Sequence, residues 1–242
     1  MNNSEHTIIR YSLITKKNPR EIVMLRGTGC QWRKCRFCDY HLDFSKDVTK
    51  NYQLNHSILT QVTGKFHRLE VINSGSFVDL DEATLLQIES ICLERQIKDL
   101  HFECHWMHRN EVIPLRERFE KIGINVHIKT GVETFDTLFR ETVLCKGFDI
   151  ATPSILANYF DEVCLLQGIS GQTVTSMRDD IETGLAHFQR VCVNIMVENS
   201  TQVKPDSDVI KAFYNFVYPH YKENDRIDIL LENTDFGVGS TT

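Results

Sequence analysis

Residues 26–44 read RGTGCQWRKCRFCDYHLDF and carry three cysteines close together, at positions 30, 35 and 38. Three thiolates on one short loop are soft ligands that suit an iron–sulfur cube. A cube held by three cysteines leaves one iron open to a small molecule, as a catalytic cluster requires. A structural zinc site normally takes four ligands. His41 is the candidate fourth ligand, so zinc stays an alternative.

The other five cysteines are scattered, mostly within apolar runs, where a cysteine usually packs as a small hydrophobic side chain. We expect them in the core: Cys92, Cys104, Cys145, Cys164 and Cys192. Basic residues gather around the cysteine loop instead, at Arg26, Arg33, Lys34 and Arg36. They would either hold a phosphate near the site or offset the negative charge of the cluster and its thiolates.

Composition narrows the class of protein. A chain of 242 residues with 41% hydrophobic residues is long enough for one large core, and we predict a single domain over 1–242. The formal charge of −6 disfavours tight binding to a polynucleotide. We see no export signal and no apolar run of membrane-spanning length, and this predicts a cytoplasmic protein with reduced thiols, not one at a membrane.

Strand-like runs alternate with amphipathic stretches, which is the pattern of βα units with a parallel sheet. Strands are predicted at 21–27, 68–74, 98–106, 124–132, either 148–154 or 162–168, 190–198 and 226–232. Helices are predicted over 81–96 with Asp81 as cap, over 111–121, over 175–188 with Thr173 or Thr175 as cap, and over 207–221. Six or seven units are too few for a closed eightfold barrel, so the fold class is α/β, a partial (β/α)6-type barrel with a mostly parallel sheet.

The carboxyl ends of barrel strands carry the variable loops, and we expect the functional residues there. The segments concerned are 27–40, 73–76, 103–108, 130–133, 168–173, 198–200 and 232–235. The cysteine loop heads this group because it follows the first predicted barrel strand.

The chain resembles the radical S-adenosylmethionine (SAM) superfamily in two features. It has a three-cysteine loop after the first strand, and an aromatic residue, Phe37, precedes the last cysteine of that loop. The spacing departs from the usual pattern, since four residues rather than three separate Cys30 from Cys35. The segments VINSGSFVD (71–79), HFECHW (101–106), IKTGVETFD (128–136) and EVCLLQGISGQT (162–173) follow in the order of that superfamily's SAM-binding strand ends.

The resemblance implies a [4Fe–4S] cluster on Cys30, Cys35 and Cys38 that cleaves SAM to methionine and a 5′-deoxyadenosyl radical. It also implies an external electron donor such as flavodoxin or ferredoxin. The SAM-binding residues it implies are Phe37, Tyr40, Asn73, Ser74, Gly75, Ser76, Glu103, Glu133, Arg140 and Gly168.

Within the superfamily, the chain resembles the lyases of bacterial queuine salvage. The resemblance rests on its compact size, on the segments HFECHWMHR (101–109) and KTGVETFD (129–136), and on the acidic ending ILLENTDFGVGS (229–240). Those enzymes cleave the N-glycosidic bond of queuosine or its 5′-phosphate to release queuine. A 7-deazaguanine base offers adjacent N–H donors to carboxylates and a face for stacking. The substrate residues expected are His105, Trp106, Glu198, Asp228, Glu232, Asp235 and Phe236, with segment 199–242 closing the substrate side.

Two other functions stay open at this point. One is a radical SAM enzyme of another reaction type acting on a small nucleoside-like metabolite. The second is a non-enzymatic zinc or iron–sulfur binding module.

Overall fold

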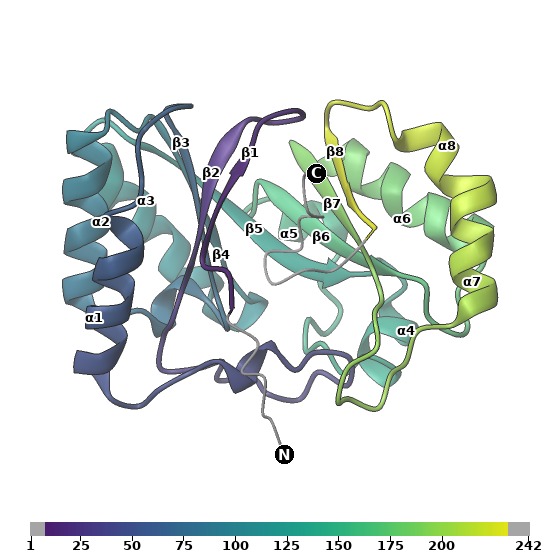
Figure 1. The fold of residues 1–242 in the computed structure, drawn as a ribbon. Coiled ribbons are helices and arrows are strands. Elements are labelled where there is room, and N and C mark those ends of the chain that lie inside the picture. The colour runs from purple at the N-terminus through teal and green to yellow at the C-terminus, as the bar shows by residue number, and fades with distance from the viewer. Residues whose placement is uncertain (1–7, 232–242) are drawn as a thin grey trace, which may run out of the picture.

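The computed structural model describes residues 8–231, whose strands form one eight-stranded sheet in chain order. The first two strands pair antiparallel, and every later neighbouring pair is parallel. The sheet curls, so that β2 and β8 lie on opposite sides of the barrel opening with β5 behind them (Figure 1). This confirms the predicted α/β partial barrel. The strands are β1 (Tyr11–Ile14), β2 (Arg20–Leu25), β3 (Arg68–Asn73), β4 (Asp99–Glu103), β5 (Asn125–Glu133), β6 (Glu162–Gln167), β7 (Arg190–Ile195) and β8 (Ile227–Leu230).

Helices cover the outer face of the sheet, with α1 to α3 on one flank and α6 to α8 on the other (Figure 1). Asp81 accepts a hydrogen bond from the backbone N of Thr84, and Thr173 accepts one from Ser176, so both predicted caps begin their helices. The helices are α1 (Val48–Leu59), α2 (Glu82–Glu94), α3 (Val112–Glu120), α4 (Thr137–Thr142), α5 (Pro153–Leu156), α6 (Val174–His187), α7 (Ser207–Ala212) and α8 (Tyr218–Tyr221). Short 3-10 helices lie at Tyr40–Leu42, Phe77–Asp79 and Trp106–Glu111.

Two local strand predictions are wrong in an informative way, and the confirmed helix over 207–221 carries an irregularity. The alternative strand at 148–154 is a loop leading into α5, because Pro153 is preset for a first helical turn. The strand predicted over 98–106 ends at Glu103, where a short 3-10 helix capped by His105 follows. The helix over 207–221 widens into a π turn at Phe213–Val217, just before Pro219, whose nitrogen cannot donate to the preceding turn.

Alternating side chains separate the core from the barrel interior. Val163 and Leu165 of β6 are fully buried in the same hydrophobic cluster as Met177 of α6. Cys164, between them, points the opposite way and lines an interior cavity, as the two-residue period of a strand requires. The apolar core therefore lies between sheet and helices, and the interior is left for polar and functional groups.

The part of the interior near the amino ends of the strands holds a set of buried charged side chains, which we call the interior ion network. Its members are Arg20, Glu70, His101, Lys129, Glu162, Arg190 and Asp228. Glu70 pairs with both Arg20 and Lys129. Glu162 Oε2 lies 3.0 Å from Arg190 Nη2. A buried charge without a partner is costly, so each carboxylate of the network lies against a cation.

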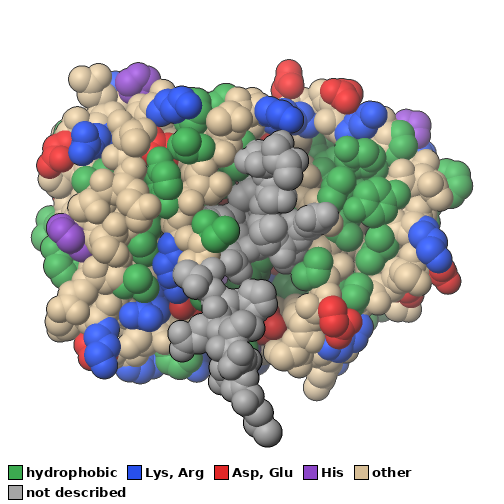
Figure 2. All heavy atoms as spheres, viewed as in Figure 1, with side chains coloured by type: hydrophobic (Ala, Val, Ile, Leu, Met, Phe, Trp, Pro, Cys, Tyr) green, Lys and Arg blue, Asp and Glu red, His purple; other side chains and the backbone are tan. Residues whose placement is uncertain are grey.

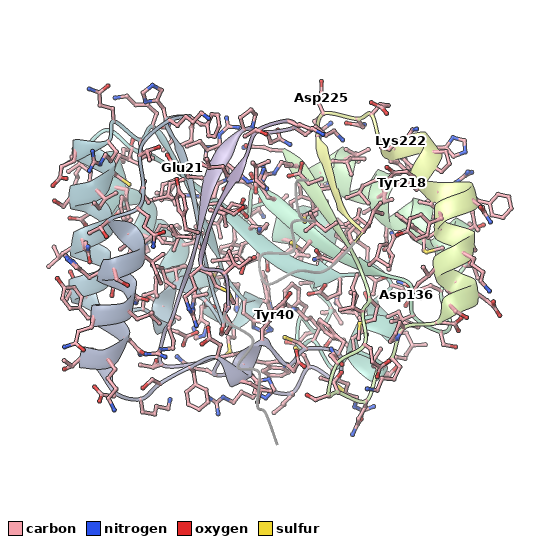
Figure 3. The ribbon with its side chains drawn as sticks, in the orientation of Figure 1. Glu21, Tyr40, Asp136, Tyr218, Lys222 and Asp225 are labelled. Atoms are coloured by element: carbon pink, nitrogen blue, oxygen red, sulfur yellow. The ribbon has the colours of Figure 1, made fainter. Side chains whose placement is uncertain are left out.

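Side chains of the turn between β1 and β2 close this end of the barrel against β8. Lys17 donates to the β8 backbone at 2.7 Å, and Asn18 donates to Asp228 Oδ1 at 3.0 Å. Asp225 marks this end in Figure 3, while Tyr40 of the cysteine loop marks the opposite end. The carboxyl ends of the strands are therefore the open end.

Within the described part of the chain, no helix is long and apolar enough to cross a membrane. Figure 2 shows side chains of both charge signs on the visible face and hydrophobic ones gathered in the seam between β8 and helices α7 and α8. Tyr218 and Ile229 pack against the core from these elements. Both elements thus contribute apolar side chains to the same core cluster.

Candidate active site around the cysteine loop

The cysteine loop, residues 27–40, crosses the open end of the barrel directly after β2 (Figure 1). Backbone hydrogen bonds tie it to the segments that follow three other strands. Cys30 N donates to the oxygen of Ser74 at 3.2 Å, beyond β3, and Arg36 N donates to the oxygen of Leu144 at 3.0 Å, beyond β5. Val203, beyond β7, donates to the Arg36 oxygen at 2.8 Å. The loop is therefore built into the barrel rim.

The three loop cysteines line one cavity of about 360 Å³. Burial raises the pKa of the Cys35 thiol and raises that of Cys38 to about 12, although the nearby Lys146 opposes both shifts. The thiols are thus protonated until a metal displaces their protons, because metal ligation requires the thiolate.

This donor set fits an iron–sulfur cube. Among residues 8–231, no group of three or more His, Cys, Asp or Glu side chains surrounds a position for a single metal ion. A cube binds each thiolate through a different iron, so its ligands need to share a cavity without converging on one point. Cys30, Cys35 and Cys38 meet that requirement.

Lys146 and Glu133 form a buried ion pair beside the thiols. Lys146 Nζ lies 2.8 Å from Glu133 Oε1 and 5.3 Å from the centre of the Phe37 ring. Burial opposes charge on Lys146, but Glu133 and the sulfur of Cys35 outweigh it and raise the lysine pKa above its ordinary value. Gly131 leaves room for the pair, since a Cβ there would lie 2.4 Å from Glu133 Oε1. The rim thus keeps a fixed cation next to the loop thiols.

The turn after β3 presents polar atoms to the cavity. Asn73 and Ser74 both line it, and neither Asn73 Oδ1 nor Ser74 Oγ has a hydrogen-bond partner among the described residues, although both atoms are buried. Leaving a buried polar atom unpaired costs on the order of 1–3 kcal/mol, so this turn is shaped for a ligand. Gly75 lets the turn approach the loop: a Cβ there would lie 2.2 Å from Asp79 Oδ2 and 3.1 Å from Cys30 N.

Glu103, at the end of β4, forms the floor of the cavity, directly above the interior ion network. Its Oε1 lies 3.3 Å from Lys129 Nζ, which also pairs with Glu70. Burial raises the pKa of Glu103, and Lys129 offsets this only in part. The Glu103 side chain is still 32% exposed, so its carboxylate faces the cavity.

Comparisons with known proteins decide the family. No family model and no curated protein sequence matches the chain. A solved structure, the queuine lyase from Clostridium spiroforme bound to SAM and queuine, has 40% sequence identity and a TM-score of 0.91, and the match covers 97% of this chain and 100% of that chain. The chain belongs to the queuine lyase family of radical SAM enzymes.

More distant structures share the fold with this queuine lyase family member. Two structures of Streptococcus suis SuiB match at 12% identity, with TM-scores of 0.56 and 0.55. The second of them is bound to S-adenosylmethionine. The matches cover 86% of this chain and 48% and 49% of the SuiB chains. Family membership identifies the chain as a radical SAM lyase and removes both alternatives, another reaction type and a non-enzymatic metal-binding module.

Most of the residues predicted to bind cluster or SAM do line the cavity of this queuine lyase family member. They are Cys30, Cys35, Cys38, Phe37, Tyr40, Asn73, Ser74, Gly75, Glu103 and Glu133. Two of the predicted substrate residues, His105 and Glu198, line it as well. Which of these side chains contacts which ligand stays a prediction.

Three predicted SAM residues are not among those that line the cavity. Ser76 supports the turn after β3 instead, its hydroxyl accepting a bond from the backbone beyond β4 at 2.9 Å. Arg140 is fully buried, with Nε bonded to Glu141 and Nη2 donating to the oxygen of Asp149 at 3.0 Å, so its charge holds the segment after α4. Gly168 has a φ of 93° and packs against α7.

Two predicted substrate residues lie away from the cavity. Trp106 packs its ring against Phe148 and Tyr159, beside the core. Asp228 belongs to the interior ion network, where its Oδ2 lies 3.3 Å from Arg20. The expected position of Asp228 at the open face is wrong, because β8 begins at Ile227 and its first residues lie at the closed end. Glu232, Asp235 and Phe236 lie outside the described residues.

Sequence reasoning missed Lys146, Cys164 and Asn194, which all line the cavity. Lys146 lies in a loop whose sequence carries no strand-end pattern. Cys164 and Asn194 were detectable, because they alternate with the outward-facing valines and leucines of β6 and β7.

Proposed function

We propose that this chain is a radical SAM lyase that cleaves the N-glycosidic bond of queuosine 5′-phosphate or queuosine and releases queuine. The observation that carries this proposal is the match, at 40% identity over nearly the whole chain, to a queuine lyase bound to SAM and queuine. A cavity of about 360 Å³ lined by three loop thiols supports it, since ligand pockets commonly have such volumes.

In this proposal Cys30, Cys35 and Cys38 would hold a [4Fe–4S] cluster, and three ligands would leave one iron open to SAM. The cluster, when bound, supplies the electron that converts SAM to methionine and a 5′-deoxyadenosyl radical. Lys146 lies close enough to Cys35 and Cys38 to oppose the shifts of their pKa values, and it offsets the negative charge of the ligated thiolates.

SAM then lies along the rim between the turn after β3 and the end of β5. The Ser74 hydroxyl, which has no partner among the described residues, donates or accepts a hydrogen bond with its methionine part, and the Asn73 side-chain oxygen accepts one from it. The Glu133 carboxylate takes the ribose hydroxyls, and Phe37 and Tyr40 cover the adenine. Fixing SAM by several strand ends holds the radical carbon in one place, which such chemistry requires.

The base lies deeper, against Glu103. The strand register places Glu103 beside Lys129, two positions below Gly131 and four below Glu133 on β5. A carboxylate at this depth can accept the adjacent N–H donors of a 7-deazaguanine, and Glu198 at the rim can meet a cationic substituent. We therefore propose that Glu103 binds the substrate base and not SAM, which the sequence resemblance had implied.

His105 has a supporting part. Its Nε2 contacts the backbone oxygen of Lys146 at 2.8 Å, its Nδ1 accepts from the Met107 backbone at 3.2 Å, and its ring stacks on Trp32. Burial, with the charge of Lys146, lowers the pKa of His105 to about 3, so it stays neutral. We assign it to holding the Lys146 segment in place.

The proposal includes one domain over 1–242 in a cytoplasmic protein. It also includes closure of the substrate side by segment 199–242, of which residues 232–242 lie outside the described part of the chain. Asn199 supports this, since its side chain donates to the Phe37 oxygen at 2.7 Å. Arg33, Lys34 and Arg36 on the cysteine loop are exposed, and they offer a docking surface for an acidic electron donor such as flavodoxin or ferredoxin.

The deciding experiment is anaerobic incubation of the cluster-loaded protein with SAM, reductant and either queuosine 5′-phosphate or guanosine 5′-phosphate. We expect queuine and 5′-deoxyadenosine from the first and no free base from the second, measured by mass spectrometry. Formation of 5′-deoxyadenosine from SAM without any queuine would reject the proposed substrate.

Glu103→Gln should keep its iron and its SAM cleavage but lose queuine release by about tenfold or more, because a charge-assisted pair of hydrogen bonds is weakened. Glu111→Gln, an exposed carboxylate on the 3-10 helix that follows β4, is the matched control. Equal queuine release by both variants would remove Glu103 from the substrate pocket.

A further inference from the structure

Two cysteines that the proposed site does not use face each other inside the barrel. Cys164 on β6 is the register partner of Cys192 on β7. Their strand neighbours Val163 and Val191 are fully buried in the outer core, so both thiols point the other way, into the interior. Both cysteines are buried as expected, but on the interior side of the sheet and not in the outer hydrophobic cluster.

The pair lies at the floor of the cavity. Cys164 lines the cavity directly, and Cys192 Sγ lies 3.9 Å from Oδ1 of Asn194, another lining residue. Two residues earlier on the same strands, Glu162 and Arg190 belong to the interior ion network. The thiols thus lie two residues nearer the rim than these buried charges and beside the space proposed for the substrate.

Cys164 is held in its protonated form. The adjacent thiol of Cys192 and burial raise the pKa of Cys164 well above its ordinary value, and Lys129 opposes them without cancelling them. A thiol that keeps its proton is a hydrogen-atom donor, since an S–H bond is weaker than the C–H bonds of a ribose.

We propose that Cys164, positioned by Cys192, donates a hydrogen atom to the sugar radical that remains once the base has left. This inference rests on the proposed function. The sugar radical forms when the 5′-deoxyadenosyl radical takes a hydrogen atom from the sugar. The base then leaves with the electron pair of the glycosidic bond and with the proton of a neighbouring sugar hydroxyl, which becomes a carbonyl, so the unpaired electron stays on the sugar. The S–H bond of Cys164 breaks homolytically, a C–H bond forms on the sugar carbon, and the unpaired electron moves to sulfur. One electron from the low-potential donor that also reduces the cluster, with one proton from solvent, restores the thiol. SAM is consumed, with one 5′-deoxyadenosine formed for each queuine.

The competing route returns the hydrogen atom from 5′-deoxyadenosine and regenerates SAM. The two routes differ in the origin of the new hydrogen, because a thiol proton exchanges with solvent and a carbon-bound hydrogen does not. Turnover of queuosine 5′-phosphate by the wild-type holoenzyme in deuterium oxide separates them without any variant. We expect one deuterium in the sugar product and 5′-deoxyadenosine equal to queuine, both by mass spectrometry.

Queuine release with no deuterium in the sugar would overturn the thiol proposal and leave the lyase assignment intact. Absence of queuine under conditions where SAM is cleaved would sink the lyase assignment, and the thiol proposal with it. The two failures are therefore distinguishable.

Variants then identify the donor. Cys164→Ser keeps a group of similar size whose O–H bond is too strong to give up its hydrogen atom, and we expect deuterium transfer to fall by at least about tenfold. First-turnover 5′-deoxyadenosine should persist, and a substrate-derived radical should accumulate in electron paramagnetic resonance spectra. Cys192→Ser should slow transfer less, because it removes only the positioning partner.

Cys92→Ser is the matched control, since Cys92 is a buried cysteine of α2 on the outer side of the sheet. Iron content and SAM affinity near wild type would show that each variant is folded and loaded. Wild-type deuterium transfer in Cys164→Ser would overturn the proposal. If that variant loads poorly, the isotope result of the wild type and the Cys192→Ser rate decide it.

Discussion

The two ends of the barrel interior use the same inward-facing positions for opposite purposes. At the closed end, Glu70 and Glu162 lie against arginine and lysine partners. At the open end, Asn73 and Ser74 keep buried polar atoms without partners among the described residues. Burying these groups costs desolvation free energy at both ends, but only at the closed end do partners within the protein offset it. Atoms of His101, Arg190 and Asp228 in the network also lack a hydrogen-bond partner among the described residues, but all three residues take part in ion pairs and none of them lines the cavity. The difference teaches that an unpaired buried polar atom indicates a ligand position where it also lines a cavity, as Asn73 and Ser74 do.

The largest expected effect is at the open end. Cys35→Ala should abolish cluster assembly and 5′-deoxyadenosine formation, because a cube needs all three thiolates of the loop. Iron analysis and anaerobic SAM cleavage measure both losses. Cys92→Ala, in the outer core, is the control and should load normally. Full iron in the Cys35 variant would mean that the loop does not hold the cluster.

At the closed end, the expected loss is of stability. Glu70→Ala leaves Arg20 and Lys129 without their shared carboxylate, and removing one partner of a buried ion pair costs about 3–5 kcal/mol. Denaturant unfolding measures it. Glu82→Ala, which breaks an exposed pair with Arg118, should cost less than about 1 kcal/mol. Equal losses of unfolding free energy in the two variants would show that the buried network contributes no more stability than a surface ion pair.

Acid should act on the closed end through Glu162. Burial disfavours its charge, but His101 and Arg190 outweigh burial and lower the pKa of Glu162 from 4.5 to about 2. A lowered folded-state pKa stabilises the protein above the unfolded-state value, and this stability is lost as pH falls through that window. The stability difference between wild type and Glu162→Gln should therefore shrink as the pH falls from 4.5 to 2. A difference that stays constant over this range would show that Glu162 gains nothing from its charge.

The smallest expected effect, from a single hydroxyl at the open end, tests the comparison of the two ends most directly. Ser74→Ala removes a buried hydroxyl that has no partner among the described residues, so the free energy of unfolding should stay level or rise slightly. SAM affinity should fall about fivefold, the worth of roughly one neutral hydrogen bond. Calorimetric titration measures the affinity, with the exposed Ser90→Ala of α2 as control. A clear loss of stability would show that the hydroxyl has a partner in the protein.

The sequence predicted the fold because its signals are local. Alternating strands, capping residues such as Asp81 and Thr173, and three cysteines in one loop all lie within single segments. The floor of the cavity could not be predicted in this way, because it depends on register between strands. Cys164 and Cys192 meet only when β6 and β7 are aligned, and Asp228 moved to the closed end because β8 starts one residue before it.

The hydrogen bond from Cys30 N to the oxygen of Ser74 links two parts of the rim that, in the proposed function, hold the cluster and SAM. Gly75 keeps them close, since any side chain there would meet Asp79 and the Cys30 backbone. Loading iron and sulfide onto the loop should consequently also fix the shape of the turn after β3. Amide hydrogen exchange at residues 73–76 should therefore slow when iron and sulfide are loaded, before any SAM is added.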